Sequence, residues 1–565
     1  MAGHESLSLG PFGSVVKEAL RGALETSLVP RIRAHDYTVW KEVPDEIVNR
    51  LGWLHCPENM QGGLAEISEF VREVREEGFD RVLLLGMGGS SLAPEMFRAV
   101  FGVREGYLDL AVLDSTHPGA VRDRALWADA GHTLFLVSTK SGGTVETLSF
   151  FKYFFERTAR ESEAERAGRA FAAVTDPGSG LETMARDLGF RKVFLNDPDI
   201  GGRYSALSHF GLVPAGLVGM DLAEVLSRAR SAASGDDESQ GLRLGVVMGT
   251  MARLGRDKLT LVTSRALAPF GAWVEQLIAE STGKEGRGIL PVHGETLMDP
   301  GAYAADRLFL QLTLRGETES DTALAALEGA GHPVVRITLD DSYDIGGECF
   351  RWEMATAVAG SILGINPFDQ PNVESAKAQA RAIVAAYREK GVLPDTPPTF
   401  LEGEVAGWTP WPAQGVEEAL RGLFSRARPG ENESKGRSYC AIQAYLQPGP
   451  DTERALFRLR TRIQERLRLA TTVGYGPRFL HSTGQLHKGD AGGCLFIQIT
   501  GETGSEEPIP DQPLGGGSSL DFGVLILAQA LGDRMALLEA GRPVVRFHLR
   551  EPAEQGIERI LGTLP

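Results

Sequence analysis

The feature that most constrains the fold is a series of short apolar runs that alternate with predicted helices. From residue 81 the runs are "RVLLLG", "LDLAVLD", "TLFLVST", "AFAAVTD" and "KVFLND". After a polar stretch near residue 235, a second series follows with "KLTLVTS", "RLFLQLTL" and "HPVVRITLD". Short apolar runs separated by helices are typical of parallel strands that are buried on both faces, so we predict doubly wound α/β sheets. Ligands of such sheets bind at the carboxyl ends of the strands.

The same pattern divides the chain into units. We predict a helical lead-in over 1–80, a first doubly wound parallel-sheet α/β domain over 81–230, a second over 242–390, a linker over 391–436, and a smaller C-terminal α/β unit over 437–565. The linker is predicted because "LPDTPPTF", "GWTPWPAQG" and "RPGENESKG" are rich in Pro, Gly and acidic residues. A weak internal repeat indicates that the C-terminal unit is folded, since "LFLQLTL" followed by "ALAALEGAGHPVVRITL" is similar to "LFIQIT" followed by "RMALLEAGRPVVRFHL".

Composition narrows the classes of partner. The 565 residues carry a formal net charge of -17, which disfavours nucleic acid and anionic membranes as partners. The four cysteines form no CxxC pair, and no His/Cys cluster has metal-ligand spacing, so we expect no metal. No organic cofactor is expected either. A reduced, cytoplasmic location fits best, because the N-terminus has no signal-peptide pattern and no apolar run reaches the roughly 20 residues of a membrane span.

Two strand-to-helix turns carry hydrogen-bond donors. The turn "GMGGSS" is neither a dinucleotide fingerprint nor a P-loop, but a glycine-rich turn that opens a helix can bind an anion. About fifty residues later, "VSTKSGGTVET" offers the hydroxyls of Thr139, Ser141 and Thr144, the charge of Lys140, and two glycines. Ordinary helix capping is the alternative for each turn alone. Two such turns in neighbouring βα units favour a site for a phosphate monoester, which has three acceptor oxygens.

Further motifs carry a resemblance to a known family. The hydroxyl-rich turn resembles sugar-isomerase-type phosphosugar-binding domains. Its combination with "GGRYSALSHFGL" (201–212), "AESTGKEG" (279–286) and "NPFDQPNVESAKA" (366–378) is similar to the glucose-6-phosphate isomerase family. The segment "GYGPRFLHSTGQLHKG" (474–489) resembles the isomerase part of bacterial transaldolase–isomerase fusions, although the chain lacks the residues for a transaldolase barrel.

The resemblance implies an aldose–ketose isomerase. Such an enzyme interconverts glucose 6-phosphate and fructose 6-phosphate through an enediolate, in glycolysis and gluconeogenesis, and the resemblance also implies a homodimer. The alternative is a non-catalytic regulatory protein that binds a sugar phosphate, which would not need a base, an arginine and a lysine together. Tolerance of mannose 6-phosphate stays open.

Four residues are assigned catalytic roles. Glu280 is the predicted base, since it flanks the apolar face of the helix "AWVEQLIAEST" and belongs to the "ESTGK" motif. By resemblance, Arg203 stabilises the enediolate and Lys377 helps to open the sugar ring. The family places a histidine ahead of a strand like "RLFLQLTL", and this chain has none there. We therefore expect a histidine of the C-terminal unit, His487 in preference to His481, to act as the ring-opening acid, from the same subunit or from a partner.

The expected substrate-binding residues belong to the two turns and to two motifs. Gln276 lies one helical turn before Glu280, and Gln370 lies two helical turns before Lys377, so each pair is expected on one face. Glu146 is expected to orient Lys140 or Arg203. The full set of substrate-binding residues is Gly89, Ser90, Thr139, Lys140, Ser141, Thr144, Glu146, Thr147, Gln276 and Gln370.

Overall fold

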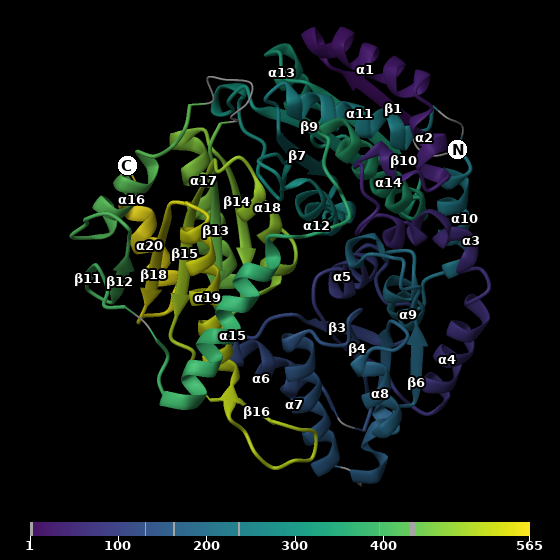
Figure 1. Cartoon of the computed structure of the whole chain (residues 1–565), viewed down its shortest axis with the longest axis vertical. Helices are drawn as coiled ribbons and strands as arrows, with labels where there is room; N and C mark the ends of the chain where they lie inside the picture. The colour runs from purple at the N-terminus through teal and green to yellow at the C-terminus, as the bar shows by residue number, and fades with distance from the viewer. Residues whose placement is uncertain are drawn as a thin grey trace.

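The protein consists of three α/β units, each built on its own sheet (Figure 1). The computed structural model describes residues 4–129, 131–161, 164–235, 238–394, 396–429, 437–504 and 506–564. Among these residues, no helix is long and apolar enough to cross a membrane.

The first sheet is entirely parallel and has helices on both faces, as the sequence predicts. Its strand order is β3-β2-β4-β5-β6. Helices α4, α5 and α9 cover one face, and α6, α7 and α8 cover the other, because alternate strand residues point into two separate apolar clusters. The strands are β2 (Arg81–Gly86), β3 (Asp109–Leu113), β4 (Thr133–Ser138), β5 (Phe171–Thr175) and β6 (Lys192–Leu195). The helices are α4 (Leu64–Glu76), α5 (Gly89–Phe101), α6 (Pro118–Trp127), α7 (Val145–Glu161), α8 (Gly180–Asp187) and α9 (His209–Leu217).

The second sheet has four parallel strands and one antiparallel edge strand, in the order β1-β10-β9-β7-β8. The edge strand β1 (His4–Ser8) comes from the segment predicted as a helical lead-in. It was missed because Leu7 is the one large apolar residue among these five, which is too few for a strand pattern. Backbone pairing with β10 decides the conformation. The other strands are β7 (Lys258–Thr263), β8 (Leu290–His293), β9 (Arg307–Leu314) and β10 (Val334–Leu339). The helices around them are α1 (Gly13–Glu25), α2 (Leu28–Arg33), α10 (Leu222–Ala233), α11 (Gln240–Arg253), α12 (Phe270–Thr282), α13 (Asp321–Gly329) and α14 (Ile345–Leu363).

The third sheet has the order β11-β12-β18-β15-β13-β14, with antiparallel pairing at β11 and β12 and parallel pairing elsewhere. Its parallel strands are β13 (Tyr439–Tyr445), β14 (Ala470–Tyr475), β15 (Cys494–Gly501) and β18 (Val544–Leu549). The helices are α17 (Pro450–Leu467), α18 (Gly484–Gly489), α19 (Phe522–Glu539) and α20 (Ala553–Gly562).

The segment expected as a linker supplies part of this third unit. It forms β11 (Phe400–Glu402), β12 (Val405–Trp408) and α16 (Val416–Phe424). Val405, Val416 and Leu420 are buried in the core of the third unit, so the Pro and Gly residues mark turns between short elements instead of a free connection. Residues 395 and 430–436 of the expected linker lie outside the described residues.

Helix α15 (Val373–Lys390) joins the second unit to the third. It packs along α19, and Figure 1 shows it in front of the third sheet, beside the first unit. The short helix α18 contacts both α12 and α15. The three units therefore meet around α12, α15 and α18, next to the carboxyl end of β4.

Candidate active site

The hydroxyl-rich turn lies between β4 and α7. Thr139 Oγ1 and Thr144 Oγ1 are 2.9 Å apart, and Gly142 has a φ of 67°, a conformation that glycine adopts without strain. Ser141, Gly143 and Thr144 line a cavity of about 550 Å³, a size typical of small-molecule sites. The N-terminus of α7 faces this cavity, which is the geometry that binds phosphate.

Three residues of the predicted phosphate set point elsewhere. Lys140 forms an ion pair with Asp176 and donates a hydrogen bond to the Pro198 carbonyl at 2.7 Å. Thr147 and Ser90 are buried and do not line the cavity. Residue type and turn position indicated donors, but they did not indicate which donors face the ligand.

The glycine-rich turn before α5 lets two distant segments of the chain pack closely against it. A Cβ at Gly89 would lie 1.9 Å from the Gly202 carbonyl oxygen, and one at Gly88 would lie 3.0 Å from the His481 carbonyl oxygen. These glycines let the loop of Arg203 and a segment of the third unit approach the first sheet. The turn therefore assembles the site.

Glu280 and Arg203 contact each other at the end of α12. The Arg203 guanidinium lies 3.3 Å from Glu280 Oε1, and Gln276 Nε2 donates to Glu280 Oε2 at 3.2 Å. The Glu280 side chain keeps 13% of its surface exposed, whereas that of Arg203 keeps 3%. A fixed cation beside a partly open carboxylate is the arrangement expected for a base with an electrostatic partner.

Five protein groups fix the Arg203 side chain. Its Nε donates to Ser281 Oγ at 2.8 Å, and its terminal nitrogens donate to the carbonyls of Pro367 and Asp369 and to Gln370 Oε1, at 2.7, 2.9 and 3.0 Å. With Glu280 as the fifth group, the guanidinium has one available position, which places its charge before any ligand arrives.

Lys284 holds the same loop from the other side. Its Nζ donates to Asp369 Oδ1 at 2.7 Å. Burial lowers the pKa of Lys284 to about 8, helped by the nearby Arg203 charge and opposed by Asp369. Ser281 and Lys284 were missed as site residues, although both belong to the "ESTGK" motif, which was the available signal.

The third unit contributes His481. Its Nε2 lies 3.0 Å from Glu146 Oε1, and its backbone carbonyl accepts a hydrogen bond from Gln276 Nε2 at 2.8 Å. The imidazole lines the cavity opposite Thr144. Arg478, three residues earlier, fixes this segment to the first unit through Asp114 at 2.6 Å.

Glu146 binds His481, so the expectation that it orients Lys140 or Arg203 is wrong. Gln529 Nε2 also donates to Glu146 Oε1, at 2.7 Å. Burial raises the pKa of the Glu146 carboxyl, but His481 and Lys377 outweigh burial and leave it below its ordinary value. An ionised carboxylate can only accept a hydrogen bond, so His481 Nε2, the atom that faces it, is the donor in this contact.

His487 does not reach the cavity, contrary to the preference stated above. It is buried in α18 between the rings of Phe479 and Phe496. Burial, together with the charges of Lys488 and Arg542, lowers the pKa of His487 well below its ordinary value, so the ring stays neutral. The segment reads as a polar loop in sequence, but it folds as a short helix that turns this side chain into the third unit.

Gln370 and Lys377 do not share a face. Helix α15 begins at Val373, so Gln370 precedes it and hydrogen-bonds Arg203 at the inner side of the site. Lys377 is exposed and lines the cavity, as do Arg381 and Arg388 of the same helix. These cations supply a local positive wall in an acidic protein.

Gln485 connects the third unit to the end of α12 and to the start of α15. Its Nε2 donates to the Gly283 carbonyl and to Asn372 Oδ1, both at 2.8 Å, and its Oε1 accepts from the Asn372 backbone. A Cβ on Gly283 would lie 2.2 Å from Leu486 Cα, so the glycine of "ESTGK" permits this approach.

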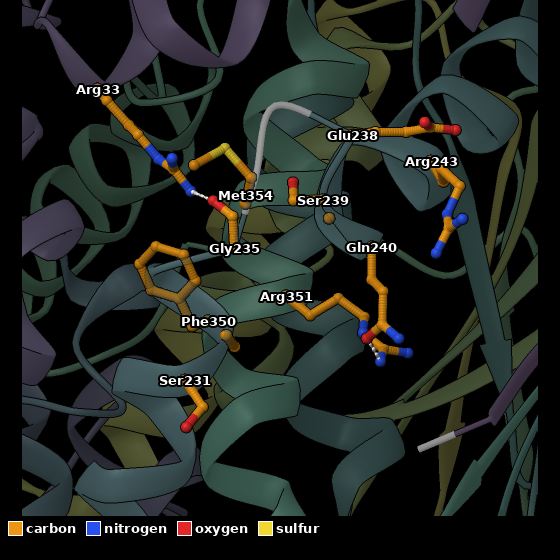
Figure 2. A pocket seen from close by; sticks show the side chains of 12 residues that line it. Arg33, Ser231, Gly235, Glu238, Ser239, Gln240, Arg243, Phe350, Arg351 and Met354 are labelled. Atoms are coloured by element: carbon orange, nitrogen blue, oxygen red, sulfur yellow. Dashed lines mark hydrogen bonds between the residues drawn. The ribbon is translucent and has the colours of Figure 1, made fainter. Parts of the chain in front are cut away.

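A second cavity, of about 280 Å³, lies at the N-terminal end of α11 and is lined by Arg33, Arg243 and Arg351 (Figure 2). Each guanidinium already contacts protein groups. Their partners are the carbonyls of Ala233 and Gly235 for Arg33, Glu5 for Arg243, and Gln240 and Glu348 for Arg351. None of the residues singled out by sequence lines this cavity, so it does not compete with the first one.

Among the residues that the structure describes, no group of three or more His, Cys, Asp or Glu side chains could hold a metal ion. The parallel sheets, the hydroxyl-rich turn at a strand's carboxyl end and the cationic cavity define a sugar-isomerase-type α/β protein.

Comparisons with known proteins identify the family. The family model described as phosphoglucose isomerase matches residues 66–285. A glucose-6-phosphate isomerase of Rubrobacter xylanophilus is 28% identical over 417 residues, which cover 64% of this chain and 94% of that protein. A probable glucose-6-phosphate isomerase of Natronomonas pharaonis is 31% identical over 352 residues, covering 54% and 80%. The chain belongs to the glucose-6-phosphate isomerase family.

Solved structures agree on the fold. The hypothetical protein TT0462 of Thermus thermophilus matches with a TM-score of 0.55 and 25% identity, over 66% of this chain and 95% of that one. A glucose-6-phosphate isomerase of Chlamydia trachomatis matches with a TM-score of 0.50 and 20% identity, over 57% and 73%. About a third of this chain lies outside the alignments with the Thermus and Rubrobacter proteins, and more than two fifths lies outside the other two.

Proposed function

We propose that the protein is a glucose-6-phosphate isomerase, an aldose–ketose isomerase that interconverts glucose 6-phosphate and fructose 6-phosphate in glycolysis and gluconeogenesis. The observation that carries the proposal is the chain of contacts from Arg203 through Glu280 and Gln276 to His481 and Glu146. It links a carboxylate and a fixed cation at the end of α12 to an imidazole that lines the cavity beginning at the phosphate-type turn. The reaction needs these three groups.

Substrate binding is assigned to the turn and the cationic wall. The phosphate lies at the N-terminus of α7, where the hydroxyls of Ser141 and Thr144 and the backbone N–H groups donate to its oxygens. Lys377 approaches from α15 and neutralises part of the phosphate charge or assists ring opening. Thr139 supports Thr144 through their hydroxyl contact.

Ring opening is assigned to His481. Breaking the bond between the ring oxygen and carbon 1 requires a proton on the ring oxygen and removal of the proton from the hydroxyl on carbon 1. The His481 imidazolium donates the former from Nδ1, because Nε2 is held by the Glu146 carboxylate. The proton of the carbon 1 hydroxyl leaves to water or to a second basic group, and the open-chain aldehyde results.

Isomerisation is assigned to Glu280 and Arg203. The Glu280 carboxylate removes the proton from carbon 2, and the electron pair moves to the carbon 1 oxygen to give the enediolate. Arg203 stabilises that negative charge, and a proton moves from the carbon 2 hydroxyl to the carbon 1 oxygen. The resulting Glu280 carboxylic acid then returns its proton to carbon 1, and carbon 2 becomes the ketone. Fixing the guanidinium through Ser281 and Pro367 means that little reorganisation is needed when the charge forms.

The resemblance to the family also implies a homodimer, which remains a prediction. A cytoplasmic location is proposed from the cysteines: Cys56, Cys349, Cys440 and Cys494 are all free and buried, as expected in a reducing compartment.

A coupled assay tests the function. Purified protein is supplied with fructose 6-phosphate, and glucose 6-phosphate is measured with an excess of a dehydrogenase that oxidises it. We expect turnover of a typical enzyme, on the order of 1–10³ per second. Binding of fructose 6-phosphate without turnover would contradict the proposal and support a non-catalytic regulatory protein.

A further inference from the structure

The second and third units share one topology. In the second sheet the parallel order is β10-β9-β7-β8, and in the third it is β18-β15-β13-β14. Each set is preceded in the chain by a strand that pairs antiparallel with its outer member, β1 with β10 and β12 with β18. A helix follows the first strand of each set, α12 after β7 and α17 after β13.

The strand registers are also the same. Phe309 pairs with Val334 in the second sheet, and Phe496 pairs with Val544 in the third. In both sheets the phenylalanine N–H donates to the proline carbonyl just before the partner strand, at 3.0 Å. The first strands agree as well, since β7 and β13 each pair their first residue with the first residue of the neighbouring strand.

The sequences follow this equivalence. "LFLQLT" of β9 corresponds to "LFIQIT" of β15, and "AGHPVVR" before and in β10 corresponds to "AGRPVVR" before and in β18. The glycines of these turns, Gly331 and Gly541, have φ values of 89° and 70°. Identical register, turn conformation and residue pattern indicate an internal duplication, and not a general likeness between α/β units.

The two units exchange reciprocal contacts. Strands β8 and β14 contact each other, and Leu290, Val292 and Ala470 belong to one apolar cluster. Helix α12 contacts α18 of the third unit, and α17 contacts the 3-10 turn Pro300–Ala302 of the second. In the same reciprocal way, Gln276 on α12 donates to the His481 carbonyl, and Arg460 on α17 donates to the His293 carbonyl, both at 2.8 Å.

The two helices differ in chemistry at the point where each donates to a carbonyl of the other unit. On α12, Gln276 and Glu280 lie one turn apart, and Gln276 Nε2 donates both to Glu280 Oε2 and to the His481 carbonyl. On α17, Arg460 and Gln464 lie one turn apart, and Gln464 Nε2 donates to Glu295 Oε1 at 2.9 Å. Glu295 is buried against Arg307 at 3.2 Å, so protein groups fill the position that stays open beside α12. The first unit contacts both copies: its α5 packs against α12, and Glu146 at the start of its α7 binds His481 of the third unit.

We infer that the third unit is an internal copy of the second and acts as its partner within the chain, so that each chain holds one complete site, with His481 supplied in cis. This inference rests on the proposed isomerase function, which it deepens. The covalent connection keeps the third unit at a high effective concentration, so no second chain is needed to deliver the histidine. A homodimer, if it forms, does not complete the site.

Complementation between two full-length variants tests the inference. Glu280→Gln lacks the base, and His481→Ala lacks the ring-opening imidazole. The two are co-expressed with different tags, so that chains can exchange while they fold, and circular dichroism checks that each variant is folded. If the histidine acts in cis, the co-expressed pool has the mean turnover of the two variants alone.

Recovery to about a quarter of wild-type turnover would overturn the inference, because random pairing in trans restores one site in half of the dimers. Wild-type turnover in His481→Ala would overturn it as well. A wild-type protein without isomerase turnover would instead refute the proposed function.

A binding titration gives a readout that does not depend on turnover. The probe is 6-phosphogluconate, an open-chain sugar acid phosphate, followed by calorimetry on the wild-type protein. We expect one molecule bound per chain. Two molecules per chain would show that the position beside α17 is also a site, and would overturn the inference.

Discussion

Helices α12 and α17 occupy equivalent places in two copies of one unit, but the polar side chains beside them differ in exposure to solvent. Beside α12, Glu280 keeps a partly exposed carboxylate next to a fixed arginine. Beside α17, Glu295 and Arg307 form an ion pair whose side chains are each 1% exposed. The scaffold is the same, so the difference in function comes from a few side chains and from the neighbour that each helix faces.

The comparison predicts that the two helices respond differently to loss of a polar group. Glu280→Gln is expected to lower turnover by about 10³ or more with little change in substrate affinity, because shape is kept and basicity is lost. Gln464→Ala, on α17, is the matched control and is expected to keep turnover within about two-fold. Steady-state kinetics on both variants measure this. Equal losses in the two variants would contradict the proposal that the catalytic base lies on α12 and that the polar cluster beside α17 is not catalytic.

The buried ion pair between Glu295 and Arg307, beside α17, is expected to stabilise the fold. Arg307→Met leaves the buried Glu295 carboxylate without its cation, which costs about 3 kcal/mol or more of unfolding free energy. Urea unfolding measures the change, and turnover of the folded protein is expected to stay within about two-fold. Arg21→Met, at an exposed ion pair of α1, is the control and should change stability by less than about 0.5 kcal/mol. A large loss of turnover in Arg307→Met without loss of stability would give the Glu295–Arg307 pair a catalytic role.

Two histidines of the third unit, His481 and His487, sharpen the comparison. His481→Ala is expected to slow conversion of the cyclic sugar by about 10²-fold, because it removes the proton donor for ring opening. Conversion of a substrate supplied in the open-chain form should change far less. His487→Ala, the matched control, removes a buried ring and should lower stability while turnover on the cyclic sugar stays close to that of the wild type. The reverse pattern would restore His487 as the ring-opening residue.

Much of the first two units could be predicted from the sequence, because buried parallel strands give continuous apolar runs. The elements β1, β11 and β12 were missed since edge strands depend on backbone pairing with distant partners more than on their own residues. Prolines and glycines around β11 and β12 indicated a linker. In the structure they separate short, buried elements.

In the candidate site, motif residues could be named but their contacts could not. Glu280 and Arg203 were found through short motifs, and the structure brings these residues, 77 positions apart in the chain, into contact. The contact between Glu146 and His481 joins residues 335 apart, so no local pattern indicates it. The preference for His487 failed because polarity of a segment does not show which of its side chains a short helix turns inward.

The smallest expected effect concerns the phosphate turn. Thr144→Ala removes one hydroxyl that lines the cavity and should raise KM several-fold with turnover nearly unchanged, since a phosphate contact exists in both the ground state and the transition state. Ser90→Ala is the control, because Ser90 is buried and does not line the cavity, and its KM should stay within about two-fold. Kinetics with varied fructose 6-phosphate measure both. A larger change in Ser90→Ala than in Thr144→Ala would move the phosphate to the glycine-rich turn.

The central claim is that Glu280 moves a proton between carbons 1 and 2 of a sugar phosphate. Conversion of glucose 6-phosphate in heavy water, followed by nuclear magnetic resonance, tests it most directly. The account predicts that the wild-type protein forms fructose 6-phosphate with deuterium at carbon 1, through exchange of the Glu280 proton with solvent, and that Glu280→Gln forms neither product nor label at a comparable rate. Deuterium incorporation at the wild-type rate in Glu280→Gln would contradict the claim, as would wild-type protein that binds glucose 6-phosphate and leaves it unchanged.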